Sequence, residues 1–273
     1  MLTPRNLLLH IDNSEHSLER LKFAQDIAKS CSARITALYA VTPWLMLYPG
    51  PLEGMSPACA VLSDEDAEKR KRAKASFQAA AASMSNVDWV EGELNSPYEF
   101  GDNALYADLM VLGQRIPSDR DVPDDFIPSV IMGSGKPAII VPTGVAHMQV
   151  PLKSVLIAWN ASRESARALC AALPLLTEGS EVHVAIFGEP TDSGPNDSIK
   201  LENYLRRHDL TPKFHLSHAT KDPGTSLLSL SAELGVDLLV MGCYGHSRVR
   251  EWVLGGATKT VLEEMSLPVL MAH

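Results

Sequence analysis

The chain has 273 residues, of which 45% are hydrophobic and 21% charged, and its formal net charge is -9 at pH 7. This length suffices for one large or two medium domains with a substantial core. The acidic balance argues against a nucleic-acid partner, because such proteins need a basic face to neutralise phosphates. Four cysteines without a CxxC spacing predict neither a disulfide framework nor a zinc site, and they favour a reducing compartment.

The N-terminal segment does not have the pattern of a signal peptide. A strand-like apolar run at residues 6–11 is followed by Asp12, Glu15 and Glu19, which an apolar leader would not contain. No apolar stretch approaches the roughly 20 residues that span a bilayer. These features predict a cytoplasmic protein without membrane contact.

Short apolar runs alternate along the chain with segments of helical spacing. In the first part, helical spacing begins near Leu18, and further helices are expected at residues 64–85 and 97–105. Strands are expected there at residues 6–11, 34–41, 87–91, 106–113 and 137–141. In the second part, strands are expected at residues 154–159, 181–187, 213–219, 236–241 and 268–272, and helices at 162–176, 197–208, 225–234 and 257–265.

Three strands of the first part match three strands of the second in the same order. Residues 5–14 lie over 153–162, residues 106–113 over 235–242, and residues 137–141 over 268–272. Two copies of one unit are therefore expected, a domain of residues 1–147 and a domain of residues 148–273. Each is predicted to be a doubly wound α/β domain with a five-stranded parallel sheet and about four helices. The short linker predicts that the two units pack directly together.

A glycine-rich loop follows the strand expected at residues 236–241. Gly242 and Gly245 precede nine residues that lead to Gly255 and Gly256, and a helix is expected from Ala257. Glycines let backbone amides approach a ligand closely, and a helix N-terminus attracts anions. Open α/β sheets bind ligands beyond the carboxyl ends of their strands. The loop therefore predicts a site for a phosphate-bearing ligand, and Arg248 within it is either a phosphate ligand or a solvated cation.

With these motifs the chain resembles a tandem universal stress protein, with two UspA-type domains. The resemblance covers nearly the whole chain, and its most specific element is the G-x2-G-x9-G pattern of Gly242, Gly245 and Gly255. It implies a Rossmann-like fold of the adenine nucleotide alpha hydrolase type, ATP or a related nucleotide with Mg²⁺ as the ligand, and a regulatory or protective role under stress. The implied binding residues are Ala158, Trp159, Asn160, Gly242, Gly245, His246, Arg248, Gly255, Gly256, Ala257 and Thr258.

Two positions of the second copy depart from the pattern of nucleotide-binding members. Gly256 stands where those members have Ser or Thr, although Thr258 offers a hydroxyl in the first turn of the helix. Asn160 stands where they have an Asp at the end of the first strand, and the first copy keeps that residue as Asp12. An Asn supplies a donor and an acceptor but no charge, so it would hold ribose hydroxyls less strongly.

The first copy keeps Asp12 and Gly113 but lacks the later glycines. Five acidic residues between Asp108 and Asp125 are expected to surround its phosphate position and to repel an anion, which indicates a degenerate, structural domain. The resemblance also implies that the last strands of the two domains, at residues 137–141 and 268–272, meet as an intramolecular domain pair. An unidentified protein partner and a homodimer of whole chains stay open.

A scaffold without nucleotide is the alternative reading, favoured by Gly256 and Asn160. An enzyme ranks last, because no GxSxG or HExxH motif and no metal-ligand spacing are present, so we predict neither catalytic nor metal-binding residues. His208, His215 and His218 are expected at the surface, and Trp159 is expected in the core. Ser162 is expected to cap a helix, and the Gly133–Lys136 segment is expected to end one.

Overall fold

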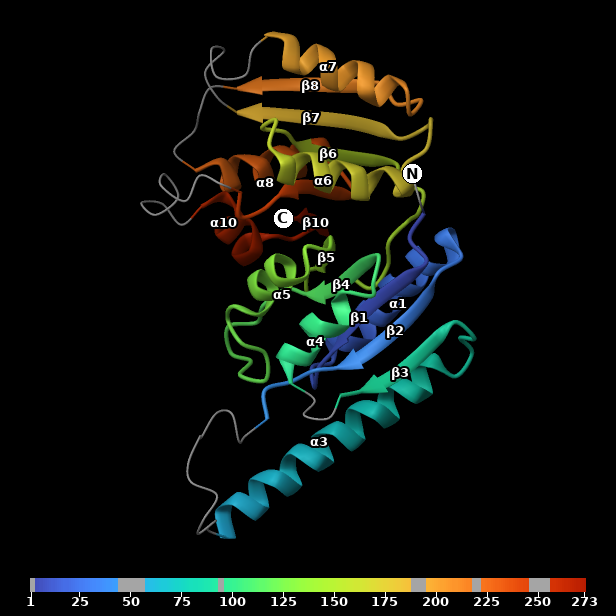
Figure 1. Cartoon of the computed structure of the whole chain (residues 1–273), viewed down its shortest axis with the longest axis vertical. Coiled ribbons are helices and arrows are strands. Elements are labelled where there is room, and N and C mark those ends of the chain that lie inside the picture. Colours follow the sequence, from blue (N-terminus) through green and yellow to red (C-terminus); the bar gives the residue numbers. More distant parts are fainter. Residues whose placement is uncertain (1–2, 44–56, 93–95, 188–194, 218–221, 246–255) are drawn as a thin grey trace.

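The structure of the chain is a computed structural model that describes residues 3–43, 57–92, 96–187, 195–217, 222–245 and 256–273. A single ten-stranded sheet runs along the molecule (Figure 1), with the strand order β3-β2-β1-β4-β5-β10-β9-β6-β7-β8. Its strands are β1 (Asn6–Ile11), β2 (Arg34–Tyr39), β3 (Val87–Glu91), β4 (Leu109–Gly113), β5 (Ala138–Val141), β6 (Ser154–Ala158), β7 (Glu181–Phe187), β8 (Pro212–Ser217), β9 (Leu238–Gly242) and β10 (Val269–Ala272).

Helices cover both faces of this sheet. One face carries α1 (His16–Cys31), α3 (Pro57–Ala81), α6 (Arg163–Ala172) and α7 (Pro195–Arg206), and the other carries α4 (Pro97–Ala104), α5 (Phe126–Ser134), α8 (Pro223–Leu234) and α10 (Ala257–Glu264). A short 3-10 helix, Leu173–Leu175, extends α6. The two faces hold separate apolar clusters, so the fold is the layered α/β arrangement that the alternating pattern predicted.

The apolar runs that predicted the strands are buried on both sides. In β1, Leu7 and Leu9 pack in one cluster while Leu8 packs in the other, because successive side chains of a strand point to opposite faces. Neighbouring strands within each half pair in parallel, including β1 with β2 and β4, and β6 with β7 and β9. Parallel strands covered on both faces need such continuous apolar sequences.

The strand order of the second half mirrors that of the first. Each half has an aspartate at the same position of the repeat, and the two aspartates make the same contacts. Asp108 accepts hydrogen bonds from the amides of Arg5 and Asn6, and Asp237 accepts them from the amides of Lys153 and Ser154, at 2.8–3.0 Å. Each carboxylate thereby ties the loop before β4 or β9 to the beginning of the first strand of its half.

The two halves join through one antiparallel strand pair. Ile140 of β5 lies opposite Val269 of β10, and Ile139 lies opposite Leu270, with all four side chains fully buried. Gln114, which follows β4, also crosses this boundary. Its amide nitrogen donates to carbonyls at the end of α10, those of Leu262, Glu263 and Met265, at 3.2–3.4 Å, and so satisfies groups that a helix C-terminus leaves unpaired. The expected pairing of the last strands is confirmed. Through this pair, the two predicted five-stranded sheets form one continuous sheet.

Helix α3 differs from its expected range of residues 64–85. It begins at Pro57, where proline fits the first turn because its missing N–H needs no partner there. It ends at Ala81, because the chain turns through Met84 to enter β3. The predicted end of α5 is confirmed, since Gly135 adopts the left-handed conformation with φ of 62° as its C-cap.

Candidate functional site

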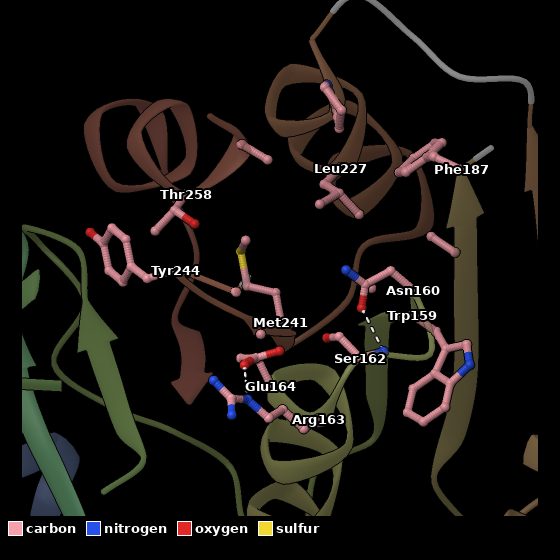
Figure 2. A pocket seen from close by; sticks show the side chains of 16 residues that line it. Trp159, Asn160, Ser162, Arg163, Glu164, Phe187, Leu227, Met241, Tyr244 and Thr258 are labelled. Carbon is pink, nitrogen blue, oxygen red and sulfur yellow. Dashed lines mark hydrogen bonds and ion pairs between the residues drawn. The ribbon is translucent and has the colours of Figure 1, made fainter. Parts of the chain in front are cut away.

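A cavity of about 760 Å³ lies in the second half, at the carboxyl ends of β6, β7 and β9 (Figure 2). The N-termini of α6, α8 and α10 complete its wall. It is lined by Ala158, Trp159, Asn160, Ser162, Arg163, Glu164, Ala185, Phe187, Pro223, Leu227, Met241, Gly242, Tyr244, Gly245, Ala257 and Thr258. This is the place where open parallel sheets bind ligands, and the volume is in the range of small-molecule sites.

The structure brings most of the predicted binding residues to this one cavity. Those that line it are Ala158, Trp159, Asn160, Gly242, Gly245, Ala257 and Thr258. Gly256 does not line it and instead occupies the N-cap position of α10. His246, Arg248 and Gly255 lie outside the described residues. The indole of Trp159 turns away from the cavity (Figure 2) and packs against the apolar cluster of the α6 face, in line with its expected core role.

The loop between β6 and α6 is fixed by local hydrogen bonds. The side-chain oxygen of Asn160 accepts from the amide of Ser162 at 3.2 Å, and Ser162 caps α6 by accepting from the amide of Ser165 at 3.1 Å. The predicted capping role of Ser162 is thus confirmed, but Ser162 also lines the cavity. The amide nitrogen of Asn160 is left directed toward the cavity (Figure 2), where it can donate to a ligand.

Two residues beside the cavity have left-handed backbone conformations without being glycine. Ala161 has a φ of 55° and Tyr244 a φ of 54°. Ala161 lies between Asn160 and Ser162, and Tyr244 lies directly before Gly245. Such conformations cost free energy and occur often at binding sites, where surrounding contacts hold them in place. Both turns therefore carry backbone strain directly beside the residues that line the cavity.

Gly242 is required for helix packing, a role that the sequence pattern did not indicate. A methyl group at this position would lie 2.5 Å from the backbone nitrogen of Ser165 and 2.6 Å from the carbonyl carbon of Glu164. The first turn of α6 therefore rests directly on the end of β9. Because these atoms belong to the backbone, they cannot rotate away from a larger side chain.

Replacing Gly242 with alanine is expected to lower the free energy of unfolding by about 1–3 kcal/mol, the usual cost of overpacking. Urea unfolding followed by circular dichroism measures the change. Gly179→Ala is the matched control, since nothing lies within 4 Å of a methyl group there. Equal effects of the two substitutions would contradict the close packing of α6 on β9.

Glu164 places a buried carboxylate in the cavity wall. Its side chain is 4% exposed and accepts a hydrogen bond of 2.5 Å from Nε of Arg163, whose side chain is 51% exposed. Burial opposes ionisation of Glu164, but hydrogen bonds from Arg163 and from its own backbone amide hold its pKa below the usual range. The carboxylate is therefore ionised at neutral pH.

Several lining residues were not predicted from the sequence. Phe187 comes from the end of β7 and Leu227 from α8, so neither belongs to the glycine loop or to the first strand of the repeat. Arg163 and Glu164 come shortly after the predicted Asn160. They could have been predicted, because the helix expected from residue 162 places them in its first turn, beside the predicted site. Only the parallel pairing of β6 and β7 brings Phe187 to the same edge.

The equivalent position of the first half is filled by its own side chains. Arg20 lies against Gly113, where a methyl group would collide with the guanidinium. The guanidinium donates to Asp12 at 2.7 Å, and the side chains of this pair are 4% and 6% exposed. A cavity of only about 30 Å³ remains beside them. In the repeat alignment, Arg20 corresponds to Ala168, so the second half has a methyl group where the first has a long guanidinium side chain.

His10 completes the buried cluster of the first half and corresponds to Ala158 in the repeat. Its Nε2 lies 2.7 Å from the carbonyl oxygen of Ala40, and its ring contacts those of Phe100 and Phe126 at centroid distances of 5.5 and 4.6 Å. Burial lowers the pKa of His10 to about 4, so the ring is neutral at physiological pH.

The expected ring of five acidic residues around this position is confirmed only in part, because Asp119 and Asp124 line the small cavity but the others do not. Asp108 lies at the other end of the strands, beside the amide of Asn6. Asp124 pairs with Arg115, and Asp121 accepts from Asn13 at 2.5 Å. The first-half site is therefore closed by the Arg20 side chain, and repulsion by unpaired carboxylates is not its main feature.

The histidines considered as metal ligands take other roles. Nε2 of His215 lies 2.9 Å from Nδ1 of His183, which places His215 in a half-buried pair and corrects its expected surface position. His208 contacts the ring of Tyr204, and His218 lies outside the described residues. Across the part of the chain that the structure describes, no group of three or more His, Cys, Asp or Glu residues could hold a metal ion.

Residues 151–273, which contain the open cavity, match the family model of the universal stress protein family. The second half of this chain belongs to the universal stress protein family. A curated universal stress protein of Synechocystis sp. is 54% identical over 35 residues, which cover 13% of this chain and 12% of that protein. The match therefore spans a small part of the curated relative's length.

The solved structure of a universal stress protein from Archaeoglobus fulgidus shows that the fold extends over both halves. It aligns with 98% of this chain and 97% of its own, with a TM-score of 0.74 and 20% identity. The cytoplasmic domain of a prokaryotic cation chloride cotransporter also aligns with 98% of this chain and 95% of its own, with a TM-score of 0.53 and 12% identity. Because such different proteins share the fold, this likeness describes architecture alone. No helix among the described residues of this chain is both long and apolar enough to cross a membrane.

Proposed function

We propose that the universal stress protein domain of residues 148–273 binds ATP or a related nucleotide and acts as a regulatory or protective module under stress. Residues 1–147 form its structural partner in a tandem pair. The observation that carries the proposal is the contrast between the two halves, since the second has a cavity of about 760 Å³ where Arg20 fills the first.

The chemistry of the cavity wall suits a nucleotide. Phe187, Leu227 and Met241 offer apolar surface for a base, while the Asn160 amide can donate to a base or ribose atom (Figure 2). The N-terminus of α10 and the hydroxyl of Thr258 lie across the cavity, and helix N-termini favour phosphate groups. With ATP as ligand, Mg²⁺ held by the phosphates would neutralise part of their charge.

ATP with Mg²⁺ is expected to stabilise the protein against unfolding. At a concentration about 100-fold above its dissociation constant, the gain is about 2.7 kcal/mol, which thermal unfolding with and without ligand detects. Gly245→Val should abolish the gain, because the side chain enters the cavity beside Glu164. Gly179→Val, where an added Cβ meets open space, should keep it. No gain with ATP, and none with AMP or adenosine at millimolar concentration, would overturn nucleotide binding in this cavity.

The alternative function is an interaction scaffold without nucleotide. Exposed apolar side chains on and directly after α4 favour it, since Tyr98 is 75%, Leu105 51% and Tyr106 84% exposed. An absent thermal shift together with an unchanged fold would favour this scaffold role. In either case we propose a binding protein in the cytoplasm rather than a catalyst.

A further inference from the structure

The carboxylate of Glu164 stands next to the backbone that the proposed nucleotide would approach. A methyl group at Gly245 would lie 3.1 Å from Oε2 of Glu164, and both residues line the cavity. A phosphate that accepts a hydrogen bond from the loop at Gly245 would therefore come within several ångströms of a fixed negative charge. Figure 2 shows this carboxylate beside Met241, at the wall of the cavity.

The partner of Glu164, Arg163, also lines the cavity, but it offsets the Glu164 charge only in part. The side chain of Arg163 is 51% exposed while that of Glu164 is 4% exposed, so solvent screens the cation more strongly than the anion. Among the described residues that line the cavity, Arg163 and Glu164 are the two that carry a charge. Glu164 consequently adds a negative electrostatic potential in the cavity. The resulting repulsion of a ligand increases with the negative charge of that ligand.

We propose that Glu164 is a specificity residue of this cavity, which selects nucleosides and nucleoside monophosphates over nucleoside polyphosphates. The proposal rests on the proposed nucleotide binding and names the class of nucleotide. Glu164 also lies in the first turn of α6, where a carboxylate stabilises the helix N-terminus. That structural role alone would not make ligand affinity depend on the number of phosphates, so the two roles can be separated.

The test measures dissociation constants of the full chain for adenosine, AMP, ADP and ATP by titration calorimetry, without divalent cations and at constant ionic strength. Glu164→Gln removes the charge and keeps the shape of the side chain. The variant should bind adenosine like the unmodified protein and should gain affinity with each added phosphate, on the order of 10-fold for ATP. Glu164→Asp, which keeps the charge, should preserve the original order of affinities.

Glu263→Gln is the matched control, because it removes one negative charge from an α10 side chain that is 52% exposed and outside the cavity lining. It should bind all four ligands like the unmodified protein. If Glu164→Gln changes all four affinities by the same factor, the specificity role is overturned while nucleotide binding stands. If none of the four ligands binds any of these proteins, and ATP with Mg²⁺ also fails to bind, the proposed function itself is overturned.

Arg163→Gln provides a second variant, and its unfolding free energy is measured alongside because it removes the hydrogen-bond partner of the buried Glu164 carboxylate. Loss of the guanidinium leaves the Glu164 charge unopposed, so affinity for ATP should fall several-fold relative to adenosine. An unchanged ratio of the two affinities would contradict the proposed field of Glu164 in the cavity.

Discussion

Replacement of Arg20 with alanine is expected to lower the free energy of unfolding by about 3–5 kcal/mol. The substitution would leave the carboxylate of Asp12 buried without its cation, and an uncompensated buried charge is strongly unfavourable. Burial opposes the ionisation of Asp12, but the adjacent guanidinium holds its pKa well below the usual range. Urea unfolding at neutral pH measures the loss.

The exposed ion pair of Arg34 and Asp88 supplies the control. Its side chains are 60% and 57% exposed, so Arg34→Ala should cost about 1 kcal/mol or less. The double variant Asp12→Asn with Arg20→Leu removes both charges and should recover most of the loss. Equal costs for Arg20→Ala and Arg34→Ala would contradict the account of a buried, charge-paired filling of the first-half site.

Acidification is expected to destabilise the protein through His10. The pKa of His10 is about 4 in the folded chain, below its ordinary value of 6.5, so the unfolded state binds a proton first as the pH falls. The stability contributed by the neutral ring is fully present above pH 6.5 and is lost as the pH falls toward 4. The loss is about 1.4 kcal/mol per pH unit and about 3 kcal/mol over the interval.

The measurement compares the unfolding free energy of the unmodified chain with that of His10→Gln between pH 7 and 4. Glutamine can still donate to the carbonyl of Ala40 but does not titrate. Carboxyl groups that titrate near pH 4 contribute to both proteins, so the difference isolates His10. Parallel curves for the two proteins would show that His10 does not titrate as expected.

Much of the fold could be predicted from local patterns. Apolar runs such as that of β1 identify buried parallel strands, and the match of residues 5–14 with 153–162 identifies the repeat. The start of α3 at Pro57 was missed, because the apolar residues of its first turns lack helical periodicity. The pairing of β5 with β10 followed from the family resemblance, since four-residue apolar strands do not specify their neighbours.

The site residues that belong to one glycine-rich loop were predicted from the sequence. Those that come together only when several helices and strands pack were not. Gly242 and Gly245 stand out in the sequence, but the contact between Gly242 and the first turn of α6 requires the packed structure. The closure of the first-half site had a signal that was not used. The repeat alignment sets Arg20 against Ala168 and His10 against Ala158, so large polar side chains in one copy replace alanines in the other.

The antiparallel pair of β5 and β10 has a consequence for how the two halves stay together. Because a covalent linker holds both strands in one molecule, their association does not weaken on dilution as that of two separate chains would. Each molecule therefore pairs one half whose site is closed by Arg20 with one half that has an open cavity. Subunit exchange cannot produce a pair with two open cavities at this junction, so its composition is set when the polypeptide is synthesised.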